Sequence, residues 1–97
     1  MARIEVSEVA AEDVERLILT HSLPSDTKNR ITSSLRSLAS FPHLGVLLEE
    51  QGWEGFRFIL GPWRWMVIVY DYDPGEDVVV IATVQDGRSS SAVTPSR

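Results

Sequence analysis

Hydrophobic and polar residues alternate along two runs in the second half of the chain, residues 55–60 and 63–72, on either side of Gly61-Pro62. A period of two over four to eight residues is typical of a half-buried β-strand. Glycine and proline between two such runs indicate a tight turn. The pattern therefore predicts a β-hairpin, with one arginine on each strand, Arg57 and Arg64.

The two faces of this hairpin differ in character. A two-residue loop pairs Leu60 with Trp63, and directly opposite residues share a face of the sheet. One face then carries Arg57, Ile59, Arg64, Met66, Ile68 and Tyr70. The other carries Phe56, Phe58, Leu60, Trp63, Trp65, Val67 and Val69. We expect the second face to be core, and we expect function on the first because it places two cations on an apolar surface.

The first half of the chain predicts a short strand and two helices. Residues 3–6 alternate, and Ser7 is a suitable N-cap for a helix that ends near His21. A second apolar stripe predicts a helix that begins at residues 24–26 and ends at Phe41-Pro42. The link between the helices is short, so we expect an antiparallel helix hairpin.

The complete order predicts the class of fold. Residues 42–52 are irregular, and residues 77–84 form a last strand after a turn at 73–76. The order strand, helix, helix and three strands predicts an α+β domain, in which the helix hairpin packs on a mostly antiparallel four-stranded sheet. We expect one domain over residues 1–88. Residues 89–97 are small, polar and aperiodic, which predicts a disordered tail.

Composition limits the chemistry that is available. The chain of 97 residues has a formal charge of −5 and no cysteine, which excludes disulfides and thiolate metal sites. Its acidity does not attract nucleic acid as a whole, although a local cationic site remains possible. No apolar run is long enough to cross a membrane and no secretory signal opens the sequence, so we expect a cytoplasmic protein. We expect no cofactor and no metal.

Four segments together resemble one known family, the RelE/ParE superfamily of toxins from type II toxin–antitoxin systems. SLRSLASFPHLG (34–45) is similar to the family's second helix and the link that follows it. WEGFR (53–57) resembles the start of its second strand. RWMVIVYDYD (64–73) and VVVIATVQDGR (78–88) resemble its third and fourth strands. The resemblance spans nearly the whole predicted domain.

The resemblance implies a toxin that is silenced by a cognate antitoxin in a hetero-oligomer. Members of the RelE branch cut messenger RNA in the ribosomal A site, whereas members of the ParE branch inhibit DNA gyrase. By position, Arg57, Arg64 and Arg88 match the basic residues of the RelE-type site, and Tyr70 shares the arginine face. Two departures are visible: the chain is acidic, and the segment after Arg88 lacks the lysines and the tyrosine or histidine that RelE-type toxins place near their site.

The chemistry leaves three functions open. Arginines can stabilise a pentavalent phosphate but cannot accept the proton of a ribose hydroxyl. Tyr70 is a weak base because a phenol has a pKa of about 10, His43 lies in a loop, and His21 follows an apolar stripe, which indicates packing. The first reading is a ribosome-dependent endoribonuclease, the second a gyrase inhibitor, and the third an interaction protein without target activity. Equally, Arg57 and Arg64 can be ordinary solvated residues of a sheet face.

Overall fold

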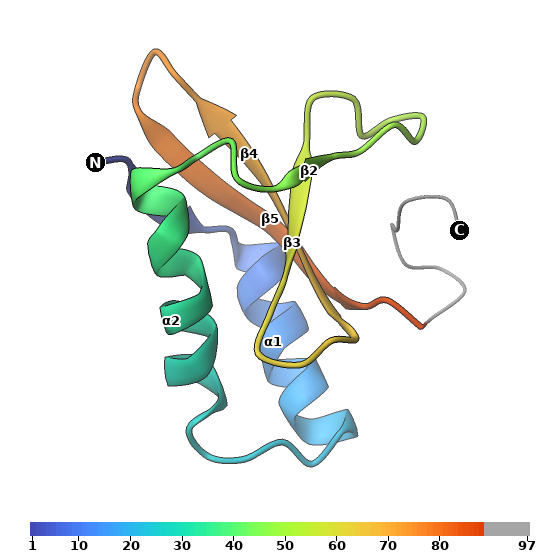
Figure 1. The fold of residues 1–97 in the computed structure, drawn as a ribbon. Coiled ribbons are helices and arrows are strands. Elements are labelled where there is room, and N and C mark those ends of the chain that lie inside the picture. Colours follow the sequence, from blue (N-terminus) through green and yellow to red (C-terminus); the bar gives the residue numbers. More distant parts are fainter. Residues whose placement is uncertain (89–97) are drawn as a thin grey trace.

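The computed structural model describes residues 1–88, and its elements follow the order that the sequence predicts. They are β1 (Arg3–Val6), α1 (Glu8–Thr20), α2 (Thr27–Ser40), β2 (Val46–Leu47), β3 (Arg57–Leu60), β4 (Met66–Asp73) and β5 (Val78–Asp86). The sheet order is β1-β5-β4-β3-β2, in which β1 is parallel to β5 and the other neighbours are antiparallel (Figure 1). The predicted α+β class is confirmed. The predicted disorder of residues 89–97 lies outside the described residues, and the extent of the domain stays a prediction.

The sheet has a fifth strand that the sequence pattern did not reveal. Val46 lies opposite Phe58, and Leu47 lies opposite Arg57. The strand has only two residues, which is too short for an alternation of period two to be visible. Residues 42–52 were therefore expected to be irregular throughout.

Ser7 connects the start of α1 to the sheet. Its hydroxyl oxygen accepts a hydrogen bond from the backbone N–H of Ala10 at 3.1 Å, as expected of an N-cap. The same hydroxyl donates to the carbonyl of Ala82 in β5 at 3.0 Å. The cap therefore determines both the residue at which α1 begins and the position of α1 relative to β5.

The β3–β4 hairpin has a longer loop than the predicted Gly61-Pro62 turn. Leu60 pairs with Val67 rather than with Trp63, so residues 61–65 form the loop. The register differs from the predicted one by four residues (67 minus 63). Because four is an even number, the side chains that stay in the strands keep their predicted grouping by face.

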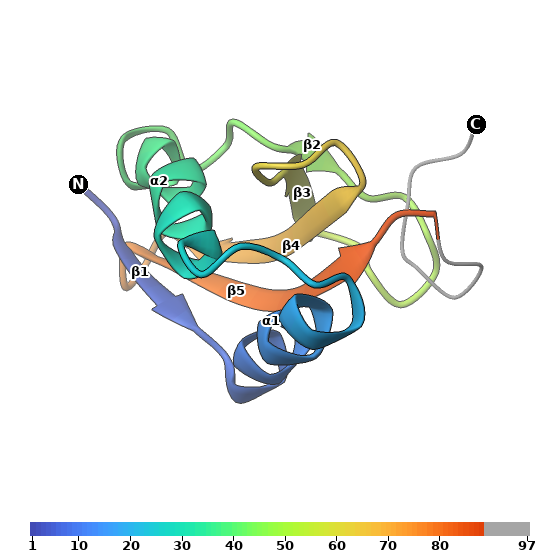
Figure 2. The same ribbon diagram turned by 90° about the horizontal axis from the view of Figure 1, so that it is seen from below.

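The face that forms the main core is the opposite of the predicted one. Met66, Ile68 and Tyr70 are fully buried and pack with the apolar residues of both helices. Figure 2 shows α1 lying beside β5, and α2 also packs next to β1. Residues Val67 and Val69, on the other face, belong to a second and smaller cluster with Leu48, Trp53, Phe56 and Phe58. Both faces of β4 are apolar, so the alternation alone could not decide which one the helices cover.

A buried carboxylate joins α1 to the free edge of β5. The pairing of β1 with β5 ends at Val6 and Ile81, so the next residues of β5 have no neighbouring strand on that side. Asp13 Oδ2 there accepts hydrogen bonds from the backbone N–H of Val84 at 3.1 Å and from the hydroxyl of Thr83 at 2.5 Å. The helix thus satisfies edge groups that a strand would otherwise pair. Within residues 1–88, no helix has the length and apolar character needed to cross a membrane.

We predict that Asp13→Ala lowers the free energy of unfolding by about 1–3 kcal/mol, because it leaves the N–H of Val84 buried without an acceptor. Urea denaturation followed by circular dichroism measures this difference. Glu12→Ala, on the exposed face of the same helix, is the matched control and should change stability by less than about 0.5 kcal/mol. Equal stability of the two variants would contradict the role of Asp13.

Candidate functional site

Arg57 and Tyr70, two of the predicted site residues, lie opposite each other on β3 and β4 and hold the segment before β2. The Arg57 guanidinium donates to the carbonyls of Gly45 at 2.8 Å and His43 at 3.2 Å. The Tyr70 hydroxyl donates to the carbonyl of Pro42 and accepts from the N–H of Gly45, both at 2.8 Å. The polar groups of both residues are therefore already engaged inside the protein.

Gly45 allows this close contact, because a Cβ there would lie 2.7 Å from the Tyr70 hydroxyl oxygen and 2.6 Å from the carbonyl oxygen of Phe58. Burial of the Tyr70 ring raises the pKa of its phenol, against smaller lowering effects of Gly45 and Arg57. The phenol consequently stays protonated at neutral pH and is a poor proton acceptor.

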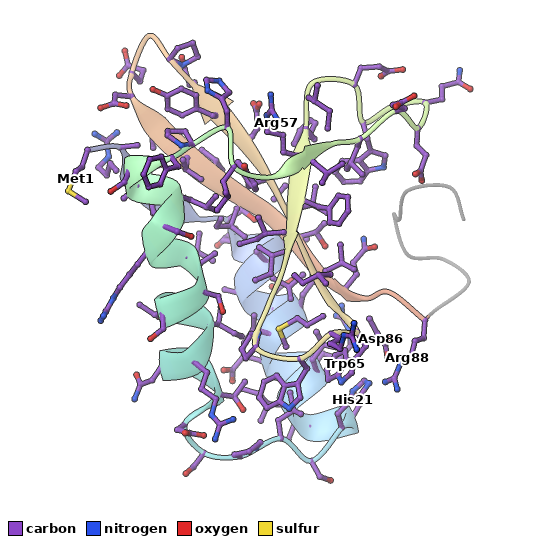
Figure 3. The ribbon with its side chains drawn as sticks, viewed as in Figure 1. Met1, His21, Arg57, Trp65, Asp86 and Arg88 are labelled. Atoms are coloured by element: carbon purple, nitrogen blue, oxygen red, sulfur yellow. The ribbon has the colours of Figure 1, made fainter. Side chains whose placement is uncertain are left out.

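The two other predicted residues, Arg64 and Arg88, are on segments that meet at the opposite end of β4, where Met66 pairs with Asp86. The N–H of Gly87 donates to the carbonyl of Trp65 at 2.6 Å, which joins the loop after β3 to the end of β5. Arg64 is exposed and forms no hydrogen bond or ion pair with another residue of the range 1–88. Figure 3 shows Arg57 far from Arg88. The structure therefore brings the segments that carry Arg64 and Arg88 side by side and places Arg57 far from Arg88. The role of these arginines stays a prediction.

Four side chains gather at the C-terminal end of α1, and we call them the α1-end cluster: His21, Trp65, Asp86 and Arg88 (Figure 3). Asp86 accepts from His21 Nε2 at 2.9 Å and from Arg88 Nε and Nη2, each at 3.0 Å. The His21 ring stacks on Trp65 with centroids 4.5 Å apart and planes inclined by 13°. The Arg88 guanidinium carbon lies 5.2 Å from the centroid of a Trp65 ring.

The charges in the α1-end cluster compensate one another. The hydrogen bonds from Arg88, the largest influence, hold the pKa of the Asp86 carboxyl well below its usual range, and the bond from His21 acts in the same direction. Asp86 in turn raises the pKa of Arg88 above its usual value. The carboxylate is therefore ionised and the guanidinium charged throughout the physiological range.

Trp63 and Trp65 are in the loop rather than on the core face with Phe56 and Phe58, which corrects the prediction. Both are half-buried and pack against the helix-side core. Their rings are 6.1 Å apart and inclined by 22°. Arg30 of α2 lies over Trp63 with 5.7 Å from its guanidinium carbon to the ring centroid. The alternation of apolar and polar residues did not reveal the longer loop. This loop places both tryptophans at the end of the sheet where Asp86 lies.

His21 is the residue whose place the sequence reasoning missed. The apolar stripe of α1 predicted that it packs, and its ring does pack on Trp65. Its bond to Asp86, however, joins residues that are 65 positions apart, and nothing local indicates such a pair. No group of three His, Asp or Glu side chains within residues 1–88 is arranged to hold a metal ion. The functional groups at this end of the sheet are thus two guanidinium groups, an imidazole and a carboxylate.

We predict that Tyr70→Phe destabilises the protein by about 1–3 kcal/mol, because the buried N–H of Gly45 loses its acceptor. Tyr72→Phe removes a hydroxyl that bonds to Asp77 at an exposed position, where water can take its place, and it should destabilise the protein less than Tyr70→Phe does. Thermal or urea unfolding of both variants compares them. A Tyr70→Phe variant as stable as the wild type would show that these hydroxyl bonds contribute nothing net.

We also predict that the stability contributed by Asp86 depends on pH. Its folded-state pKa lies below the ordinary 3.8, so the contribution is complete above about pH 4 and declines as the pH falls further towards the folded-state value. The difference in unfolding free energy between wild type and Asp86→Asn, measured in urea from pH 7 to pH 2.5, should therefore shrink at the acid end. Asp71→Asn, at an exposed position of β4, should show no such trend, and a difference for Asp86→Asn that is constant over the range would refute the assignment.

Comparison with solved structures identifies the fold. The toxin–antitoxin complex RelBE of E. coli matches with a TM-score of 0.68 at 15% identity, covering 92% of this chain and 100% of the matched chain. The isolated E. coli RelE toxin matches with 0.67 at 15% identity, covering 94% and 89%. The RelBE2 complex of Mycobacterium tuberculosis matches with 0.59 at 20% identity, covering 88% and 96%. At these identities the likeness concerns the fold alone.

Sequence comparison identifies the family. No curated protein matches the sequence. The model of the family described as the ParE toxin of the type II toxin–antitoxin system parDE, however, matches residues 4–90, which is most of the chain. The chain therefore belongs to the ParE toxin family of type II toxin–antitoxin systems, within the RelE/ParE superfamily.

Proposed function

We propose that this toxin cleaves messenger RNA on the ribosome, and that Arg64 and Arg88 hold the scissile phosphate. The observation that supports the proposal is the backbone contact between Trp65 and Gly87, next to the imidazole that stacks on Trp65. It brings the segments of Arg64 and Arg88 side by side, although 24 positions (88 minus 64) separate the two arginines. Metal-free cleavage of RNA needs positive charge around a pentavalent phosphate and a group that accepts a proton. Arginine provides the first because its planar fork binds two phosphate oxygens at once.

Both arginines are accessible to a phosphate. Arg64 is exposed, and the Arg88 side chain is 64% exposed even while it is bound to Asp86. Its bonds to Asp86 use Nε and Nη2, so the other terminal amino group of the guanidinium can bind a phosphate. In this proposal Arg57 and Tyr70, which the sequence placed in the same catalytic set, act by holding residues 42–45.

The partner that silences the toxin is, in our proposal, a cognate antitoxin. The matched RelBE structures are complexes of a toxin with its antitoxin. The surface here offers an apolar groove of about 400 Å³ between α1 and α2, beside which Lys28 forms an ion pair with Glu15. Its apolar lining includes Val6, Val14, Ile31 and Leu35. An apolar antitoxin segment can occupy this groove, or a strand can add to an open sheet edge.

A second candidate, inhibition of DNA gyrase, has support of its own. The matching family is that of ParE toxins, the branch to which the sequence resemblance assigns gyrase inhibition. Arg57 and Arg88 are bonded to acceptors within the protein, and the chain is acidic with a charge of −5. These features suit a surface that binds a protein better than one that binds RNA.

We predict that induction of the toxin alone arrests bacterial growth, and that co-expression of the small open reading frame next to it restores growth. Arg64→Gln should relieve the arrest and slow cleavage of ribosome-bound message by about 10²-fold or more, since it removes a donor to the transition state. Primer extension on ribosome-bound message measures cleavage. Arg36→Gln, at an exposed position of α2, is the matched control and should remain toxic.

Other outcomes of this experiment are equally informative. Growth arrest with intact messages and inhibited supercoiling by purified gyrase would replace the nuclease by the gyrase inhibitor. Absence of arrest, with the antitoxin still bound, would leave an interaction protein without target activity.

A further inference from the structure

The imidazole of His21 is the only side chain at the Arg64–Arg88 end, within residues 1–88, that can both accept and release a proton near neutral pH. His21 is the C-cap of α1, and its backbone N–H donates to the carbonyl of Leu17 at 3.0 Å. Its side chain is 26% exposed, so it is anchored but accessible. We propose that His21 is the proton acceptor of the cleavage reaction and that Asp86 and Trp65 position its ring, an inference that rests on the proposed function.

The contacts of the ring decide which nitrogen is free to react. Nε2 lies 2.9 Å from Asp86 Oδ2, and because an ionised carboxylate only accepts hydrogen bonds, Nε2 carries a hydrogen. In the neutral ring, the lone pair is then on Nδ1. Nδ1 lies 2.8 Å from the hydroxyl oxygen of Thr20, which is exposed. A rotation of that hydroxyl, or its replacement by a ribose hydroxyl, frees Nδ1 to take a proton.

The carboxylate and the indole fix the ring in this orientation. Asp86 holds Nε2 in the same way that a carboxylate orients the histidine of a hydrolytic triad. Trp65 stacks on the ring with centroids 4.5 Å apart, which opposes rotation of the ring about its Cβ–Cγ bond. The pKa of Asp86, held well below its usual range mainly by Arg88, keeps the carboxylate ionised at every pH at which the imidazole titrates.

The same contacts place the imidazole next to the phosphate site. Arg88 shares both Asp86 and Trp65 with His21. A phosphate bound by Arg88, with Asp86 still on Nε2, would therefore lie close to the ring. The charged groups that contact His21 or its partners are Asp86, at the end of β5, and Arg88, which follows it closely in the chain. The lowered pKa of Asp86 and the raised pKa of Arg88 keep both groups charged over the pH range of the test.

The step that these groups support is a transesterification. Nδ1 of His21 takes the proton from the ribose 2′-hydroxyl, and the 2′-oxygen forms a bond to phosphorus. The bond between phosphorus and the 5′-oxygen breaks, and that oxygen takes up a proton from the imidazolium or from water. The products are a 2′,3′-cyclic phosphate and a 5′-hydroxyl, with no redox change. The two arginines stabilise the negative charge of the pentavalent phosphate by donating hydrogen bonds to its oxygens.

The test compares single-turnover cleavage of ribosome-bound message by wild type and His21→Gln between pH 5.5 and pH 8.5. The glutamine amide can still donate to Asp86 but cannot accept the proton. We expect the wild-type rate to fall with decreasing pH, because a group that accepts a proton in the reaction has to be unprotonated beforehand. His21→Gln should be about 10²- to 10⁴-fold slower, which is the usual contribution of general base catalysis, and should lack that dependence on pH.

Controls separate catalysis from structure. His43→Gln changes the other histidine, an exposed residue whose ring contacts Tyr72 edge-on, and should cleave like the wild type. His21→Gln should bind the antitoxin and unfold like the wild type. If it is unstable, His21→Asn is tested in its place, together with the wild-type pH profile.

The two levels of the proposal fail in different ways. A histidine variant that cleaves within about threefold of the wild-type rate with the same pH profile overturns the role of His21 alone, since a general base contributes at least about 10²-fold. A wild-type protein that arrests growth but cuts no message overturns the proposed function and the role of His21 with it.

Discussion

Strand β4 is buried on both faces from Met66 to Tyr70, and the other elements are arranged around this constraint. Each large apolar side chain that is fully buried contributes about 1.5–3 kcal/mol, so neither face of this strand can be left in water. The two helices cover the face of Ile68, and the segment from Leu48 to Phe58 covers the face of Val69. The sheet is therefore a middle layer, with the two helices on one face and the smaller segment before β3 on the other.

The same arrangement determines what the acidic chain can do. β5 pairs along the whole length of β4, so Asp86 is brought opposite Met66. α1 runs beside β5 from Ser7 to His21, and Asp13 fastens it halfway. A histidine, a carboxylate and an arginine consequently meet on a protein of formal charge −5, beside the segment that carries Arg64. The local field depends on where the charges are placed, and the total charge describes it poorly.

Several features followed directly from the sequence, each because its cause is local. The strand Arg3–Val6 and the cap at Ser7 follow from alternation and from a hydroxyl at a helix start. The grouping of Arg57, Ile59 and Ile68 on one face follows from the period of two, and it survived an error of four residues in register. The choice of the core face did not follow, because both faces of β4 are apolar and only the packing of the helices distinguishes them.

For the site, the sequence by itself determined which residue types are available. They are eight arginines but a single lysine, two histidines and no cysteine. Only the tertiary structure decided their use. It assigns Arg57 and Tyr70 to the support of residues 42–45, it leaves Arg64 exposed, and it brings His21 to Asp86. The physical reason is that alternation and capping act over a few residues. The length of the loop after β3 and the position of the end of α1, by contrast, are set by packing between segments far apart in the chain.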